Sequence, residues 1–171
     1  MAAYEAGAHG LGRAPRPPKK GQTMVDIQHR IGIAATPERV FDAFATNGGL
    51  TDWWTREVEG NAAPGGTLRF YFGAPEPSAV MEVGEAAPTR HVEWRCVGGP
   101  DEWVGTRVTF DLQTGEDETV VLFAHAGWRE PSEFMAHCST KWALLLLGLK
   151  DGLEGGKATP FPNDPKISRW G

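Results

Sequence analysis

His125 is the side chain of this sequence that is best placed for chemistry. It ends the run Thr119–His125, in which every second residue falls on one face of an expected strand, together with Val121 and Phe123. An imidazole, with an ordinary pKa near 6.5, can bind a ligand's carbonyl or hydroxyl group or act as a general acid and base. A neutral core histidine that is hydrogen-bonded to the backbone suits the same position, and both interpretations stay open.

Aromatic rings are the second feature that points to a site. The chain holds seven Trp and eight Phe residues, and rings of this size pack either in a core or around a ligand. Strand alternation and helical spacing direct one set of side chains inward. This set is predicted to line a ligand-binding cavity, with core packing as the alternative: Trp53, Trp54, Phe70, Phe72, Met81, Trp94, Phe110, Phe123, His125, Trp142 and Leu145.

Other chemistry finds little support in the sequence. The pair His125 and His137 has no third ligand at a spacing typical of a metal site. Glycine-rich phosphate loops, nucleophile elbows and calcium loops are missing. Cys138 is expected on the apolar face of a helix, buried and inert. We therefore predict no catalytic residue, no metal ligand and no cofactor, which makes an enzyme the less favoured class.

The charge and the hydrophobic pattern limit the classes of partner that are expected for this protein. The chain carries a net charge of −5, and residues 1–23 hold four Lys or Arg against one Glu, so the remainder carries −8. An acidic body is a poor surface for nucleic acid. No apolar run approaches the roughly 20 residues needed to span a membrane. Without a visible export signal, Cys96 and Cys138 are expected as free thiols in the cytoplasm.

The elements that must position these residues begin with a strand at Val25–Ile33, where apolar and polar residues alternate. Thr36 and Pro37 suit the start of a helix, and Gly48–Gly49 is expected to end it. Leu50–Trp54 is expected to form a second short helix. Turn residues then separate further strands, with a short strand near Val58 as an addition: Thr67–Phe72, Ala79–Glu85, Arg90–Val97, Trp103–Leu112 and Thr119–His125.

The chain ends in a long helix and a tail. Pro131–Glu133 opens the helix, apolar residues recur in it every three or four positions, and Gly155–Gly156 closes it. The chain as a whole is predicted to consist of three units: a disordered leader at residues 1–23, one domain at 24–158, and an extended tail at 159–171. The short loops between strands leave no room for crossover helices, so the sheet is predicted to be antiparallel.

One α+β architecture satisfies this order, namely a curved antiparallel sheet of six to seven strands wrapped around the C-terminal helix, with two short helices after the first strand. The sequence resembles the START-like helix-grip superfamily, also called SRPBCC. Within it, the chain is similar to the branch of the C-terminal domain of the activator of heat-shock ATPase homologues (AHSA-type). The residues that carry this resemblance are Ile33–Phe44, Leu50–Trp54, Thr119–Trp128 and Lys141–Gly156.

The resemblance implies three functions that use this fold differently. The favoured one is binding of an apolar small molecule, lipid-like or aromatic, in a cavity between the sheet and the C-terminal helix. The alternatives are a cyclase or hydratase that uses His125 in the same cavity, and a co-chaperone-like module that stimulates a heat-shock ATPase. A homodimer is also plausible, because Trp103 and Trp170 are expected at the surface.

Overall fold

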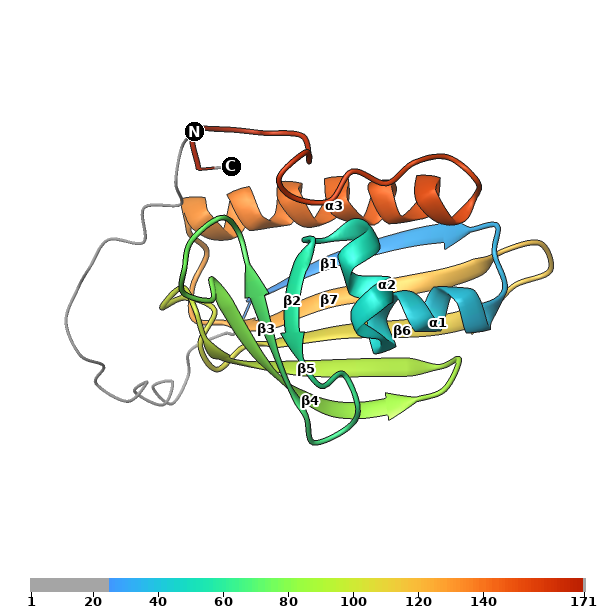
Figure 1. The fold of residues 1–171 in the computed structure, drawn as a ribbon, viewed down its shortest axis with the longest axis horizontal. Coiled ribbons are helices and arrows are strands. Elements are labelled where there is room, and N and C mark those ends of the chain that lie inside the picture. Colours follow the sequence, from blue (N-terminus) through green and yellow to red (C-terminus); the bar gives the residue numbers. More distant parts are fainter. Residues whose placement is uncertain (1–24, 171) are drawn as a thin grey trace.

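The structure is a computed structural model that describes residues 25–170. The predicted leader at residues 1–23 lies outside this range. The chain runs from one strand through two short helices and six further strands to a long helix (Figure 1). The bounds are β1 Val25–Ile33, α1 Pro37–Ala45, α2 Asn47–Trp53, β2 Glu57–Gly60, β3 Thr67–Tyr71, β4 Ala79–Ala87, β5 His91–Gly98, β6 Arg107–Thr114, β7 Thr119–Trp128 and α3 Glu133–Leu153.

The seven strands form one antiparallel sheet of order β1-β7-β6-β5-β4-β3-β2. Strands 2 to 7 are neighbours in chain order because each is joined to the next by a short loop. The helix α3 lies along β1, and α2 packs between α3 and the β2 end of the sheet (Figure 1). This arrangement confirms the predicted α+β helix-grip class.

Thr46 joins α1 to α2. Its hydroxyl accepts a hydrogen bond from the Gly49 N–H at 2.9 Å, and its own N–H donates to the Asp42 carbonyl at 3.2 Å. The glycines predicted to end the first helix therefore stand in the first turn of the second. A Cβ atom at Gly49 would lie 2.1 Å from the Asp42 carbonyl oxygen, so only glycine allows the two helices to meet this closely.

The strand β6 begins later than predicted, at Arg107 rather than at Trp103. The preceding residues form a turn in which the Trp103 N–H donates to the Pro100 carbonyl at 2.8 Å and the Thr106 N–H donates to the Trp103 carbonyl at 2.9 Å. Gly105, with φ of 92°, supplies the left-handed conformation that this turn needs. The turn brings the Trp103 ring close to α3, where it stacks on Trp142.

Aromatic rings fill the centre of the molecule. The Phe110 ring lies at the middle, with centroid distances of 3.9 Å to Phe44 and 4.9 Å to Trp94. Phe123 bridges to the helix, since its ring lies 4.8 Å from that of Trp142. All five rings are at most 2% exposed. The centre of the predicted hollow between sheet and helix is therefore packed solid, and the cavity described below lies to one side of it.

The helix α3 begins where the Ser132 hydroxyl accepts a hydrogen bond from the Met135 N–H at 3.0 Å. None of the helices in the described part of the chain is both long and apolar enough to cross a membrane. After α3 the chain turns back and runs along the helix (Figure 1). Phe161 in this returning segment forms a bridge with Thr55, which ties the segment to the end of α2. We call residues 159–170 the strap.

Candidate functional site

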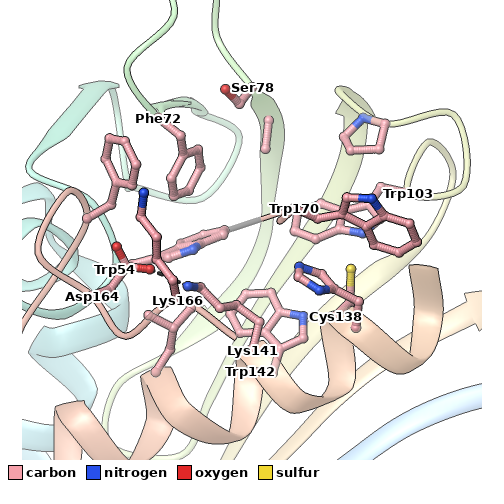
Figure 2. Close-up of a pocket in the computed structure, with 15 residues that line it drawn as sticks. Trp54, Phe72, Ser78, Trp103, Cys138, Lys141, Trp142, Asp164, Lys166 and Trp170 are labelled. Carbon is pink, nitrogen blue, oxygen red and sulfur yellow. Dashed lines mark ion pairs between the residues drawn. The ribbon is translucent and has the colours of Figure 1, made fainter. Parts of the chain in front are cut away.

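An apolar cavity of about 100 Å³, partly open to solvent, lies between the first half of α3, two loops and the strap (Figure 2). The loops are those that connect β3 to β4 and β5 to β6. Its lining consists of Trp54, Phe72, Ser78, Ala79, Pro100, Trp103, His137, Cys138, Lys141, Trp142, Leu145, Phe161, Asp164, Lys166 and Trp170. A cavity of about 150 Å³ admits benzene, so this space holds only one end of a larger ligand while the strap stays in place.

Three tryptophans form the inner wall. The Trp142 ring from α3 lies 5.0 Å from that of Trp54 and 6.1 Å from that of Trp103. The rings of Trp142 and Trp103 are nearly parallel, at 17°. All three side chains are at most 9% exposed. A wall of this kind offers flat apolar faces, which suit the packing of a flat or aliphatic molecule.

The strap forms the outer wall. The Phe161 N–H donates to the Trp54 carbonyl at 3.0 Å, and its ring packs edge-on against Phe72 with a centroid distance of 5.5 Å. Further along, the buried Asp164 carboxylate forms an ion pair with Lys141 of α3, marked by the dashed line in Figure 2. The strap is thus fastened at Phe161 by backbone and ring contacts and at Asp164 by an ion pair. Towards its end, the Ser168 hydroxyl lies 3.2 Å from Nδ1 of His137, and the Trp170 ring packs against those of Phe134 and His137.

His125 lies behind this wall, in the core. Its Nδ1 accepts a hydrogen bond from the Trp142 Nε1–H at 3.1 Å, so the proton of the neutral ring is on Nε2. Nε2 donates to the Thr106 hydroxyl at 2.8 Å, and that hydroxyl donates to the Trp103 carbonyl at 2.6 Å. Both ring nitrogens are therefore occupied within the protein, and His125 fixes the position of the Trp142 indole.

Burial lowers the pKa of His125 to about 3. The side chain is completely buried, and protonation of Nδ1 would break its hydrogen bond with Trp142. Its side-chain hydrogen bonds go to Thr106 and Trp142, neither of which is ionisable at neutral pH. The cyclase or hydratase alternative needs an ionisable partner for His125, and these contacts supply none.

Both cysteines are free and buried, and the burial of Cys138 confirms its prediction. Burial raises the pKa of the Cys138 thiol to about 12, which the neighbouring Trp103 side chain opposes only in part. Burial likewise raises the pKa of Cys96 to about 11. Cys138 contributes to the cavity wall but stays protonated at neutral pH, so it serves as an apolar surface rather than as a nucleophile. Residues 25–170 contain no group of three side chains that could bind a metal.

The structure divides the eleven predicted site residues into two groups. Four of them line the cavity: Trp54, Phe72, Trp142 and Leu145. The other seven lie in the core behind or beside it: Trp53, Phe70, Met81, Trp94, Phe110, Phe123 and His125. Strand alternation identifies an inward face correctly, but it does not distinguish a ring that meets another ring from one that meets open space.

Sequence reasoning missed the cavity residues that come from loops and from the strap. Trp103 was expected at the surface, but the turn at Pro100–Gly105 folds it inward, and it is only 9% exposed. Trp170 is 49% exposed, as expected. Phe161 stands between two prolines in a mostly polar tail, and this aromatic residue is the sequence signal that the first half of the tail packs against the domain.

Comparisons with known proteins agree with this architecture. Residues 34–154 match the family model described as Activator of Hsp90 ATPase homolog 1-like protein. The solution structure of the Aha1 dimer from Colwellia psychrerythraea superposes on this chain with a TM-score of 0.72 and a sequence identity of 44%. The match covers 79% of this chain and 100% of the Colwellia chain. No curated protein matches the sequence.

Two further solved structures show the same fold at lower identity. The AHSA1-like protein from Rhizobium etli is 21% identical, with a TM-score of 0.65 and coverage of 88% of this chain and 95% of its own. CalU16 from Micromonospora echinospora is 20% identical, with a TM-score of 0.59 and coverage of 72% of each chain. Because one family model spans most of the chain, including all four motifs at least in large part, this protein belongs to the family of Activator of Hsp90 ATPase homolog 1-like proteins.

Proposed function

We propose that the protein binds an apolar small molecule in the cavity beside α3. The observation that carries this proposal is the lining itself, in which aromatic rings surround a space that no side chain fills: Trp54, Phe72, Trp103, Trp142, Phe161 and Trp170. Burial of a ring or an alkyl chain against such walls is favourable at roughly 25 cal/mol per Å² of apolar surface. The ligand's apolar end occupies the cavity, and the rest extends under the strap.

His125 supports this site without touching the ligand. It holds the Trp142 indole by a hydrogen bond, and Trp142 presents its ring to the cavity. The core rings behind the wall keep the tryptophans in place. The eleven residues of the predicted set are thus proposed to have two roles. Trp54, Phe72, Trp142 and Leu145 contact the ligand, and the other seven hold these side chains in position from the core.

Binding can be measured with phenylnaphthylamine, a neutral probe whose fluorescence rises in an apolar site. We expect the wild-type protein to enhance its emission and to transfer energy to it from tryptophan. Ser78→Trp places a large ring at the cavity wall and should weaken probe binding about tenfold or more. Thr114→Trp, at the exposed end of β6, is the matched control and should bind like wild type. Equal binding by both variants would place the probe elsewhere.

A second candidate function is stimulation of an Hsp90-type ATPase, and the family match together with the 44% identical Aha1 structure favours it. If it holds, the purified protein raises the rate of ATP hydrolysis by its chaperone. The variant Ser78→Trp should retain this stimulation, because an effect exerted through the protein surface does not need the cavity. An unchanged hydrolysis rate with a folded, saturating protein would exclude this function.

A homodimer is part of the same proposal. The Colwellia psychrerythraea protein was solved as a dimer. In the described part of this chain, the large hydrophobic side chains most exposed to solvent are Leu147, at 52%, and Trp170, at 49%. Leu147 is exposed on α3, and Trp170 is half-exposed at the end of the strap, where one side of its ring packs against Phe134 and His137. The exposed parts of both side chains can contact a second copy.

A further inference from the structure

We infer that the ligand is an amphipathic carboxylate, whose apolar body enters the cavity and whose carboxylate replaces Asp164 as the partner of Lys141, which releases the strap. This inference rests on the proposed function and adds the chemical class of the ligand. It follows from the charges at the cavity, from what holds Lys141, and from the small size of the closed cavity.

The charged side chains at the cavity are positive on balance. Lys141 and Lys166 carry positive charge and Asp164 carries negative charge. The pKa of His137, also in the lining, is lowered by burial and by the nearby Lys141, so this ring is neutral at pH 7. A net charge of +1 at the cavity contrasts with −5 for the whole chain. The field at the mouth therefore favours an anion over a cation.

Both partners of the Lys141 ammonium come from the strap. It pairs with the Asp164 carboxylate and donates to the Pro165 carbonyl at 2.9 Å. The Lys141 side chain is only 21% exposed, and that of Asp164 only 7%. If a neutral ligand pushed the strap away, a partly buried ammonium would lose its partners, which is costly. A ligand carboxylate prevents this loss, because one carboxylate then takes the place of another.

The strap has to move for any ligand of useful size. The cavity of about 100 Å³ holds only one end of a dodecyl chain or of a naphthalene ring while the strap covers it. Residues 165–170 are exposed apart from the half-buried Ile167, so this part of the strap is its most exposed region. Its other contacts with α3, the Ser168 hydrogen bond to His137 and the packing of Trp170 on Phe134 and His137, lie at its exposed end and part with it when the strap moves. Its attachment at Asp164 is ionic and exchangeable, whereas the attachment at Phe161 is a backbone bridge that remains.

Lys166 supplies a second positive charge where the strap leaves the mouth. It is exposed, and no ion pair of Lys166 is found within residues 25–170. Figure 2 shows it reaching from the strap across the open side of the cavity. Its charge attracts an incoming carboxylate before Lys141 is exchanged. Lys166 is therefore expected to contribute less to the affinity than Lys141 does.

The test compares ligands that differ only in the charged group. Dodecanoate is paired with dodecanol, and naphthoate with naphthylmethanol, each as a competitor of phenylnaphthylamine. We expect the wild-type protein to bind at least one acid about tenfold or more tightly than its alcohol. Lys141→Met should reduce this ratio to about one, and Lys166→Met should reduce it less. Asp164→Asn should raise the ratio, because the ligand no longer competes with a carboxylate.

Lys150→Met is the matched control, since Lys150 lies on the same helix but pairs with Glu154 and the Gly32 carbonyl, away from the cavity. It should leave the ratio unchanged. Thermal melts verify that each variant is folded, and faster hydrogen exchange of residues 164–170 with the acid bound reports release of the strap. A ratio near one for both pairs, or a ratio that Lys141→Met leaves unchanged, overturns the inference. Absence of binding by the probe itself and by both members of each pair, in wild type and in Asp164→Asn, overturns the proposed function instead.

Discussion

The free energy of unfolding is expected to fall by about 1.4 kcal/mol for each pH unit between roughly pH 6 and pH 4 on account of His125 alone. Burial holds the pKa of His125 at about 3 in the folded protein, against an ordinary value of 6.5. Below pH 6.5 the unfolded chain therefore binds a proton that the folded protein does not bind. The stability is complete above pH 6.5 and is lost as the pH falls towards 3.

Urea unfolding at a series of pH values measures this slope. His125→Gln removes the titrating group while it keeps one donor and one acceptor, so its slope should be shallower than that of wild type by about 1.4 kcal/mol per pH unit. The variant should also be less stable at pH 7, since the bonds to Thr106 and Trp142 are disturbed. Gln113→Asn, at an exposed position of β6 without a titrating group, is the control and should keep the wild-type slope. Equal slopes in wild type and His125→Gln would contradict the prediction.

The second prediction separates the core rings from the cavity rings. Phe110→Ala should lower the free energy of unfolding by about 3–5 kcal/mol, because this fully buried ring contacts Phe44, Trp94 and Phe123 and its removal leaves a void. Phe72→Ala should lower it by only about 1 kcal/mol, since this ring is half-buried at the cavity. Chemical denaturation of the two variants measures the difference.

Ligand binding should show the reverse order. Phe72→Ala removes a wall of the cavity and a contact of the strap, so it should weaken phenylnaphthylamine binding about tenfold. Phe110→Ala should not weaken it under conditions where the variant is folded, because Phe110 does not reach the cavity. Loss of probe binding in Phe110→Ala, with Phe72→Ala unaffected, would mean that the ligand enters the core and not the space beside α3.

The difference between core rings and cavity rings could not be predicted from the sequence, whereas local features could. The period of two at Val25–Ile33, the cap at Thr36 and the helix start at Pro131–Glu133 depend on near neighbours in the chain, and the structure confirms each of them. The family resemblance is confirmed for the same reason, since its motifs are local. The pair Gly48–Gly49 predicts a helix end because glycine usually interrupts a helix. In the structure, Gly49 instead allows the backbone of α2 to approach the Asp42 carbonyl closely.

The sequence by itself determined the elements, their order, and which face of each strand turns inward. Only the tertiary structure decided that the rings of Phe110 and Phe123 meet other rings, while those of Phe72 and Trp142 also border open space. It also decided that Trp103 folds inward and that Asp164 reaches Lys141 across 23 residues of chain. The physical reason is that periodicity depends on backbone geometry over a few residues, whereas an unfilled space depends on how side chains from distant segments fit together in three dimensions.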